Sequence, residues 1–350
     1  MRVGLCTQYI DGEYTGVGHF ITRLLQHWMD YPDPHEFHLI HMKEGGNPLY
    51  EKVAAEHVFS SKTRALWWRS QDRFCKGLSK ELDLIHEPFM GLPSKMDCPQ
   101  VLSFHDIVPL TNPEYSSRMF GMYFKRVMPK VIRNADVVLC NSEATRHDLL
   151  DHYPADPERI KVVYHGVDQL TSNGGGVLSD KEPYMMAMSH TKMKNVGFTI
   201  GEFLRYKDAH PGPLRLMVVG TDFSGLSDGQ SDVEVTGYLE RDRLIDLLAG
   251  AEAFLFPSHS EGFGYPPIEA MSLGVPTVVS DRGSLPEVVG DAALIVDIDR
   301  EGSLADAIHQ LRSDEGLADE LRKKGRERCK RFTWERCARE IMDVYESLGR

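Results

Sequence analysis

Short apolar runs recur along the first half of the chain, and each ends in polar residues. They cover residues 3–6, 37–42, 82–86, 101–106, 137–142 and 160–165. Runs of this length and character are typical of strands buried on both faces of a parallel sheet. Helical stretches, such as 19–29 and 115–133, lie between several of them. The alternation predicts a doubly wound α/β domain.

A second series of apolar runs follows an interruption. Residues 168–183 are rich in Gly, Ser, Asn and Asp, which is a linker composition. Beyond them we predict strands again alternating with helices, at residues 184–188, 214–220, 233–237, 253–256, 277–281 and 293–297. The pattern therefore predicts two domains of α/β class, 1–168 and 183–335, joined by a linker at 169–182.

Composition narrows the class of protein. The 350 residues are 41% hydrophobic and 26% charged, as in ordinary soluble proteins. A net charge of -12 argues against a general nucleic-acid binder. Six cysteines without a C-x-x-C pair signal neither a disulfide framework nor a zinc knuckle, and they favour a reducing cytoplasm. With no signal peptide and no run of about 18 apolar residues, we expect a cytoplasmic protein that does not span a membrane.

Candidate chemistry follows the run at 253–256, because ligands of open parallel sheets bind beyond the C-terminal strand ends. Glu261 is predicted in the loop after this strand. Pro266 and Pro267 fit the first turn of a helix that Gly274 ends, which predicts Glu269 near the helix N-terminus. The unpaired N–H groups there attract a diphosphate. One carboxylate is suited to a sugar hydroxyl and the other to a ribose.

The loop between the two carboxylates, Gly262-Phe263-Gly264, is the predicted donor-binding backbone, since glycine permits close approach to a ligand. Taken singly, each glutamate is also compatible with an ordinary solvated residue. Together they form an E-x7-E spacing, with Pro-Ser before it and Glu-Ala-Met-x-x-Gly-x-Pro at its end. This combination resembles the motif of the retaining glycosyltransferases of family 4.

The resemblance implies a GT-B fold, in which two Rossmann-like domains face each other across a cleft. It implies that Glu261 holds hydroxyls of a donor sugar and that Glu269 holds the ribose of a nucleotide. Family 4 chemistry is independent of metal, so neither a metal nor a cofactor is expected. Arg331-Phe332-Thr333-Trp334-Glu335 is similar to the family's closing element, and GT-B proteins commonly pack a last helix, here about 336–350, back on the first domain.

In the first domain, Gly16 and Gly18 stand where a loop turns into a helix. A tight turn alone would explain them, but they also match the glycine-rich loop that lines the donor site in family 4. The dinucleotide fingerprint is incomplete, because Ile21 stands where its third glycine is expected. This departure counts against a nicotinamide-dependent oxidoreductase.

His105 closes the run at 101–104, and residues 105–109 resemble the His-Asp-x-x-Pro element of family 4. A histidine at a strand end is suited to hydrogen-bond sugar hydroxyls near neutral pH, so we expect a donor-sugar contact. A satisfied structural histidine is the alternative. No His-x-x-x-His pair or carboxylate cluster signals a metal site.

Chemistry without a metal needs cationic side chains, because a departing nucleoside diphosphate develops negative charge. Lys192 and Lys194 follow the run at 184–188, and Lys194-Asn195 resembles the family's phosphate-binding step. Many members also carry an arginine near position 188, where this chain has methionine. Lys192 is the candidate replacement. Two solvated lysines in a turn are the alternative.

The motifs together predict a retaining hexosyltransferase with His105, Glu261 and Lys194 as its catalytic residues. The acceptor hydroxyl would attack on the face from which the diphosphate leaves, and the leaving phosphate would take the proton. Residues 104–109 and 141–149 look closest to mannosyltransferases, which favours GDP-mannose as the donor. A UDP-sugar is the alternative donor, and a non-catalytic sugar-nucleotide or glycan-binding protein is the alternative function.

Two basic-aromatic segments, residues 60–80 and 116–134, stand out in the acidic chain with a local charge of +5 each. Such segments fit anionic lipid at the inner face of a membrane, or a lipid-diphosphate acceptor. Aromatic side chains in the core beneath a solvated basic face are the alternative. The expected partners are therefore a nucleotide-sugar donor and a glycan or lipid-linked acceptor of polysaccharide or glycolipid synthesis, with a possible contact to anionic membrane and no nucleic acid.

Overall fold

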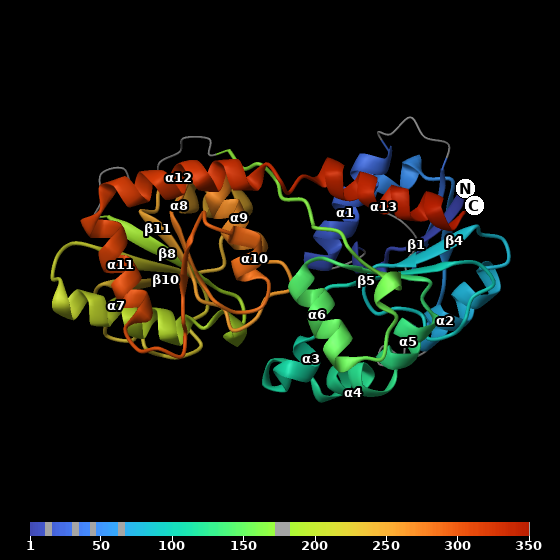
Figure 1. The fold of residues 1–350 in the computed structure, drawn as a ribbon, viewed down its shortest axis with the longest axis horizontal. Coiled ribbons are helices and arrows are strands. Elements are labelled where there is room, and N and C mark those ends of the chain that lie inside the picture. The colour runs from blue at the N-terminus through green and yellow to red at the C-terminus, as the bar shows by residue number, and fades with distance from the viewer. Residues whose placement is uncertain (11–15, 30–34, 43–46, 62–66, 172–182, 350) are drawn as a thin grey trace. The chain divides into compact units, whose positions relative to one another are not determined.

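The computed structural model describes residues 1–10, 16–29, 35–42, 47–61, 67–171 and 183–349. They form two compact units, and each is described by itself. Unit 1 comprises Met1–Gly166 and Trp334–Arg350, and unit 2 comprises Val167–Thr333 (Figure 1). Of the predicted linker at 169–182, residues 172–182 lie outside the described part of the chain.

Unit 1 contains a parallel sheet in the order β3-β2-β1-β4-β5-β6-β7. Its strands are β1 (Arg2–Cys6), β2 (Glu36–His41), β3 (Ala55–Val58), β4 (Leu84–Glu87), β5 (Gln100–Phe104), β6 (Val137–Cys140) and β7 (Ile160–Val162). The six predicted runs are all strands here. The edge strand β3 was not predicted, because its residues alternate between exposed and partly buried and make no apolar run.

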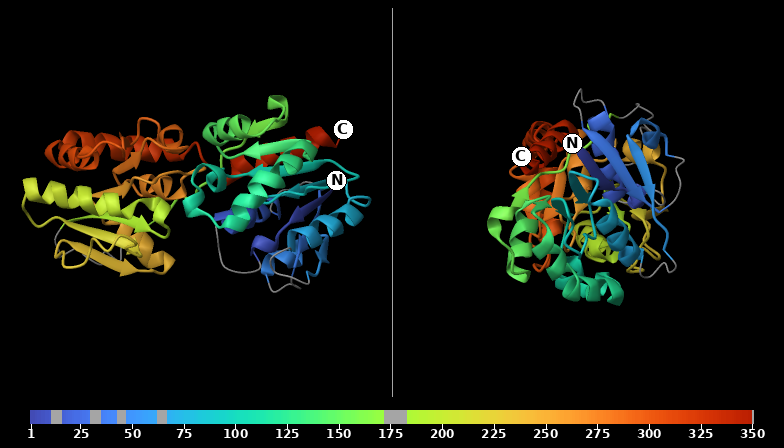
Figure 2. Two further views of the ribbon diagram at one scale, coloured as in Figure 1. Left: turned by 90° about the horizontal axis from the view of Figure 1, so that it is seen from below. Right: turned by 90° about the vertical axis from the view of Figure 1, so that its right-hand side faces the viewer.

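The helices of unit 1 cover both faces of this sheet (Figures 1 and 2). They are α1 (Gly16–Met29), α2 (Trp67–Leu78), α3 (Val108–Thr111), α4 (Arg118–Arg126), α5 (Met128–Asn134), α6 (Glu143–His152) and α13 (Trp334–Leu348), with short 3-10 turns η1 (Gln8–Ile10), η2 (Pro48–Lys52), η4 (Pro113–Tyr115) and η5 (Pro157–Arg159). The helix predicted at 115–133 was wrong as a single element. It is divided at Val127, because Pro129 has no N–H and is tolerated only in the first turn of a new helix, α5.

The last helix, α13, packs in unit 1, where it lies beside α1 (Figure 1). The Trp28 indole N–H donates to the carbonyl of Ala338 at 3.1 Å. The Tyr345 hydroxyl lies 2.5 Å from Nδ1 of His86 in β4. These buried polar contacts fix the helix against both α1 and the sheet.

Unit 2 contains a second parallel sheet, in the order β10-β9-β8-β11-β12-β13. Its strands are β8 (Tyr184–Ser189), β9 (Arg215–Gly220), β10 (Val233–Gly237), β11 (Ala253–Phe256), β12 (Thr277–Ser280) and β13 (Leu294–Val296). Its helices are η6 (Lys192–Lys194), α7 (Val196–Ala209), α8 (Arg241–Ala249), α9 (Tyr265–Ser272), α10 (Leu285–Val289), α11 (Ser303–Ser313) and α12 (Glu315–Cys329). All six strands predicted for this half are present.

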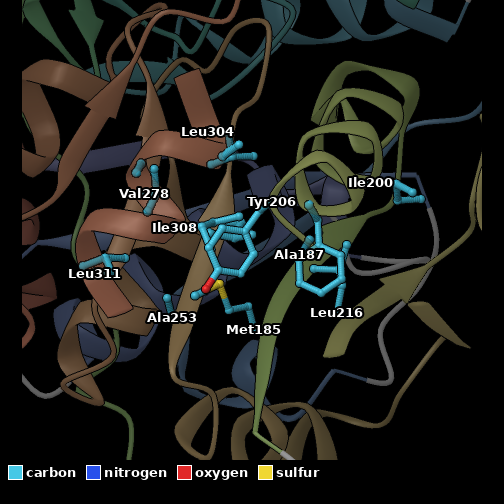
Figure 3. Packing of buried hydrophobic residues seen from close by; sticks show 14 of the residues in the cluster. Met185, Ala187, Ile200, Tyr206, Leu216, Ala253, Val278, Leu304, Ile308 and Leu311 are labelled. Atoms are coloured by element: carbon cyan, nitrogen blue, oxygen red, sulfur yellow. The ribbon is translucent and has the colours of Figure 1, made fainter. Parts of the chain in front are cut away.

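One face of the unit 2 sheet is closed by α7 and α11. Figure 3 shows Met185 and Ala187 of β8 in one cluster with Tyr206 of α7 and Ile308 of α11. Ile308 is fully buried, and the cluster continues through further side chains on the strands and both helices. This packing holds the strands rigidly, so the loops at their C-terminal ends start from fixed positions. Among the helices that the structure describes, none is both long enough and apolar enough to cross a bilayer.

Candidate functional site

Two loops of unit 2 meet at the C-terminal edge of its sheet. The turn η6 follows β8, and residues 257–264 follow β11, the strand that pairs with β8. The carbonyl of Met193 accepts from Ser258 Oγ at 3.0 Å and from the His259 N–H at 2.9 Å. Adjacent parallel strands therefore bring together two loops that are far apart in sequence.

Lys194 and Glu261 form an ion pair at this junction. Lys194 Nζ lies 2.5 Å from Glu261 Oε1, and the two side chains are 14% and 11% exposed. The ammonium also lies 5.0 Å from the centre of the Phe256 ring, within cation–π range. Partial burial strengthens the attraction and leaves one face of each group to solvent or a ligand. Burial, and then the charge of Lys194, lowers the pKa of neighbouring His190.

The loop after β12 fixes the backbone of Glu261. The Glu261 carbonyl accepts from the Ser284 N–H at 3.1 Å and from Ser284 Oγ at 3.0 Å. Gly283 has φ +55°, and a Cβ there would stand 2.6 Å from the same carbonyl oxygen. Sequence reasoning missed both residues, although a Gly-Ser step that begins two residues after the end of a predicted strand was an available signal.

The glycine loop leads into α9 as predicted. Gly264 has φ +91° and precedes the helix, and Pro266 and Pro267 lie in its first turn. Gly274 ends it at φ +75°, where its N–H bonds to the Met271 carbonyl at 2.9 Å. Phe263 is buried and packs edge-on against neighbouring rings. A ligand contact at position 263 would therefore come from the backbone.

Glu269 lies on α9, two residues after the prolines of the first turn. The helix begins at Tyr265, so Glu269 belongs to its second turn, and no acidic residue occupies the first. The unpaired backbone N–H groups at the N-terminus of α9 therefore belong to residues that precede Glu269.

Glu269 is paired with Arg241, the first residue of α8, which is the helix that follows β10. Arg241 Nη2 lies 2.8 Å from Glu269 Oε1 and 3.8 Å from Asp168 Oδ2. Burial raises the pKa of Glu269, Asp168 raises it further, and Arg241 lowers it. Sequence reasoning missed Arg241 and Asp168. The available signal for Arg241 was its place just after a predicted strand end.

Two further side chains of unit 2 are accessible at this edge. Lys192 is exposed on the same turn as Lys194. Tyr238 follows β10 directly and is 80% exposed. A cavity of about 380 Å³ lined in part by Met185, Glu252 and Arg312 lies elsewhere, since Met185 is near the start of β8 rather than its end.

In unit 1, the two glycines and His105 lie at the corresponding edge. Gly16 opens α1 in an exposed position, and a Cβ there would meet nothing within 4 Å, whereas Gly18 is buried. His105 follows β5, and its Nε2 lies 2.6 Å from the Pro88 carbonyl. Nε2–H must donate there, so the neutral ring presents Nδ1 as an acceptor. Burial lowers the pKa of His105 to about 4, while the bond to Pro88 acts in the opposite direction.

A buried carboxylate that sequence reasoning missed holds the loop containing Pro88. Glu87 ends β4 and accepts from the Tyr9 hydroxyl at 2.8 Å and from the N–H groups of Phe89 and Met90 at 3.1 and 3.2 Å. Gln71 also donates to it. Burial raises the pKa of Glu87, and these hydrogen bonds lower it. Because Glu87 fixes the residues that follow it, it also fixes the carbonyl that orients His105.

The predicted site residues thus form two groups. Lys192, Lys194, Glu261, Gly262, Phe263, Gly264 and Glu269 belong to unit 2, and Gly16, Gly18 and His105 belong to unit 1. Within the ranges that the structure describes, no three His, Cys, Asp or Glu side chains are grouped as metal ligands.

Comparison with known proteins connects both units to one class. Residues 14–169 match the family model described as Glycosyltransferase Family 4, and residues 190–328 match the model described as Glycosyl transferases group 1. The chain is 28% identical over 284 residues to O-antigen chain mannosyltransferase B of Escherichia coli, covering 76% of this chain and 74% of that protein. It is also 28% identical over 285 residues to alpha-maltose-1-phosphate synthase of Mycolicibacterium smegmatis, covering 72% and 73%.

Solved structures share the fold. Sucrose-phosphate synthase from Thermosynechococcus elongatus superposes with a TM-score of 0.78 at 18% identity, covering 99% of this chain and 98% of that one. Anabaena HepE in complex with UDP and glucose superposes with a TM-score of 0.74 at 19% identity, covering 99% and 100%.

Proposed function

The chain belongs to the GT-B glycosyltransferases, and we propose that it moves a hexose from a nucleoside-diphosphate sugar to a glycan or lipid-linked acceptor with retention of anomeric configuration. The observation that carries the proposal is the Lys194–Glu261 ion pair at the C-terminal edge of the unit 2 sheet. A nucleotide sugar has hydrogen-bonding groups that complement both side chains. Its phosphates accept from an ammonium, and its hydroxyls donate to a carboxylate.

The donor is proposed to lie along this edge of the sheet. Lys194 and Lys192, with backbone N–H groups of residues 262–264, would neutralise the diphosphate, so the transfer needs no metal. Glu261 would hold hydroxyls of the sugar. Glu269, held by Arg241, would accept from the ribose. The exposed ring of Tyr238 is suited to stack against the nucleobase.

The chemistry we propose is attack on the face from which the diphosphate leaves. Bond formation between the acceptor oxygen and the anomeric carbon accompanies rupture of the bond to the phosphate oxygen. The acceptor proton passes to that phosphate, whose negative charge Lys194 stabilises. His105 of unit 1 presents Nδ1 as an acceptor, which suits it to orient a sugar hydroxyl.

Mannose from GDP-mannose is the proposed donor substrate, supported by the likeness to an O-antigen chain mannosyltransferase. A UDP-sugar is the second candidate, supported by the likeness to a HepE structure that contains UDP and glucose. The relatives favour a role in polysaccharide or glycolipid synthesis. We place the reaction in the cytoplasm, since all six cysteines are unpaired thiols.

A thermal-shift screen of nucleotide sugars tests the donor, because a ligand that binds only the native state raises its melting temperature. We expect GDP-mannose to stabilise the protein more than UDP-glucose does, and NAD not to stabilise it. Proton NMR of the anomeric signal then reports retention in the product. Stabilisation by a donor that is neither hydrolysed nor transferred, with any acceptor offered, would identify a binding protein and contradict the proposal.

A further inference from the structure

The helix α4 presents two opposite faces. Tyr123 and Phe124 are buried in the hydrophobic core of unit 1, and Phe120 packs against them. On the other side, Met119 and Met122 are 57% and 53% exposed. The three aromatic side chains of α4 pack against the core of unit 1. The two exposed methionines are not needed for this packing. Figure 1 shows α4 at the outer margin of its unit.

Basic side chains surround the exposed methionines. Arg118, Met122 and Arg126 are spaced four residues apart and so form one row along the solvent side of the helix. Met119 lies on one side of this row and Lys125 on the other, and all five are exposed. The next helix, α5, adds exposed Lys130 and Arg133. We call these seven residues the α4 surface.

The charge of the α4 surface is opposite to that of the whole protein. Residues 116–134 contain five basic residues and no acid, in a chain with a net charge of -12. The exposed acids Glu114 and Asp136 lie just beyond the two ends of this segment. A partner that avoids the acidic remainder of the protein but attracts this patch must itself be anionic.

The second basic-aromatic segment differs. In α2, Trp67 and Trp68 pack against the core, and Lys76 forms an ion pair with Asp97 at 2.8 Å. The large apolar side chains of α2 are not exposed as Met119 and Met122 of α4 are. Of the residues 60–80, 62–66 lie outside the described part of the chain.

We propose that the α4 surface docks on an anionic lipid bilayer. Lysine and arginine side chains are attracted by acidic lipid headgroups, and unbranched thioether side chains between them enter the apolar boundary below. A nucleic acid would satisfy the charges but offers the methionines no apolar phase. The contact goes beyond sugar transfer, because it would hold the enzyme where lipid-linked acceptors are concentrated, without a spanning segment.

Vesicle flotation of the full chain tests the proposal. We expect the protein to float with phosphatidylcholine vesicles containing about a third phosphatidylglycerol, to remain free with phosphatidylcholine alone, and to dissociate as salt is raised. Retention on neither vesicle, or on both equally, would overturn the proposal. So would equal affinity for a single-stranded RNA probe, which would indicate a polyanion site instead.

Two pairs of substitutions separate the apolar contribution of the methionines from the electrostatic contribution of the basic residues. Met119→Gln with Met122→Gln should reduce flotation several-fold while leaving charge unchanged, and Lys125→Glu with Arg126→Glu should reduce it more than tenfold. Lys323→Glu with Arg326→Glu, on exposed positions of α12, changes the net charge equally and should leave flotation unaltered. Equal losses in both charge variants would show a net-charge effect and contradict a specific surface. Flotation requires no turnover, so it is independent of the proposed transferase activity.

Discussion

At the scale of single residues, the charged side chains of the site form ion pairs with each other in the absence of a ligand. Lys194 pairs with Glu261, and Glu269 pairs with Arg241. The sequence motifs identified Lys194, Glu261 and Glu269. They could not show these contacts, because a separation of 67 residues between Lys194 and Glu261 is closed only by the pairing of β8 with β11. Arg241 belongs to no recognised motif, and a lone arginine at a helix start looks like an ordinary solvated residue.

The raised pKa of Glu269 predicts how donor binding depends on pH. Burial raises this pKa above 4.5. The ionised carboxylate accepts from two hydroxyl groups more strongly than the protonated acid, one of whose oxygens carries a hydrogen. Donor affinity should therefore fall as pH decreases through the raised pKa. Arg241→Met removes the charge that lowers the pKa, so the loss should begin at higher pH. The measurement is the KM for the donor across the weakly acidic range.

The matched control for this profile is Arg300→Met, which breaks an exposed pair with Asp306 outside the site. In this control, the KM for the donor should begin to rise at the same pH as in the wild type. If Arg241→Met also began to lose donor affinity at that pH, Arg241 would not act through Glu269.

At the scale of elements, most strands could be predicted because parallel strands buried on both faces leave continuous apolar runs. The edge strand β3 leaves no such run, and a proline divides the helix expected at 115–133 into α4 and α5. The glycine turns after β11 and β12 were only partly predictable. Gly264 was identified from the motif, whereas the role of Gly283 depends on its contact with Glu261, which only the fold shows.

Gly283→Ala should lose activity through the backbone. The new Cβ would stand 2.6 Å from the Glu261 carbonyl oxygen, so Glu261 must move. A displacement of about 1 Å at a catalytic group can cost about 100-fold in rate. The left-handed φ adds a cost of about 1–2 kcal/mol in stability. Initial transfer rates and urea unfolding measure the two effects.

Gly302→Ala separates these effects, because Gly302 has φ +84° and a Cβ there would meet nothing within 4 Å. This variant should lose stability by a similar amount and keep its transfer rate. If Gly283→Ala also kept its rate, the turn after β12 would not position Glu261.

At the scale of the whole molecule, the alternation of strands and helices was enough to predict two α/β units. The sequence could not show that β4 and its loop link Glu87, Pro88 and His105 in one network, since Glu87 stands in no motif. Unit 1 also buries His86, between the Tyr345 hydroxyl and Ser103 Oγ. Each unit thus combines an apolar core with polar groups that only tertiary structure brings together.

The buried histidines predict that unit 1 loses stability in acid. Burial lowers the pKa of His86 to about 3 and of His105 to about 4, and it also lowers that of His165. In the unfolded chain each takes up a proton near pH 6.5, so stability should fall as pH decreases from there, by up to about 1.4 kcal/mol per pH unit for each histidine. Glu87, whose pKa is raised, opposes this loss only between pH 4.5 and its raised value.

Tryptophan fluorescence during urea unfolding measures this loss, because all four tryptophans belong to unit 1. We expect a lower midpoint at pH 5.5 than at pH 7.5, and a smaller difference in His86→Asn. Equal midpoints for the wild type at the two pH values would contradict neutral buried histidines.

The most direct test of the donor site is the transfer rate of Lys194→Ala and Glu261→Gln, measured with the nucleotide sugar that stabilises the wild type most and compared with Lys323→Ala as an exposed control. We expect a loss of about 10²- to 10³-fold in each site variant, as for other preorganised charge-stabilising groups, with a folded protein and an unchanged control. Rates within about twofold of the wild type in both site variants would contradict it.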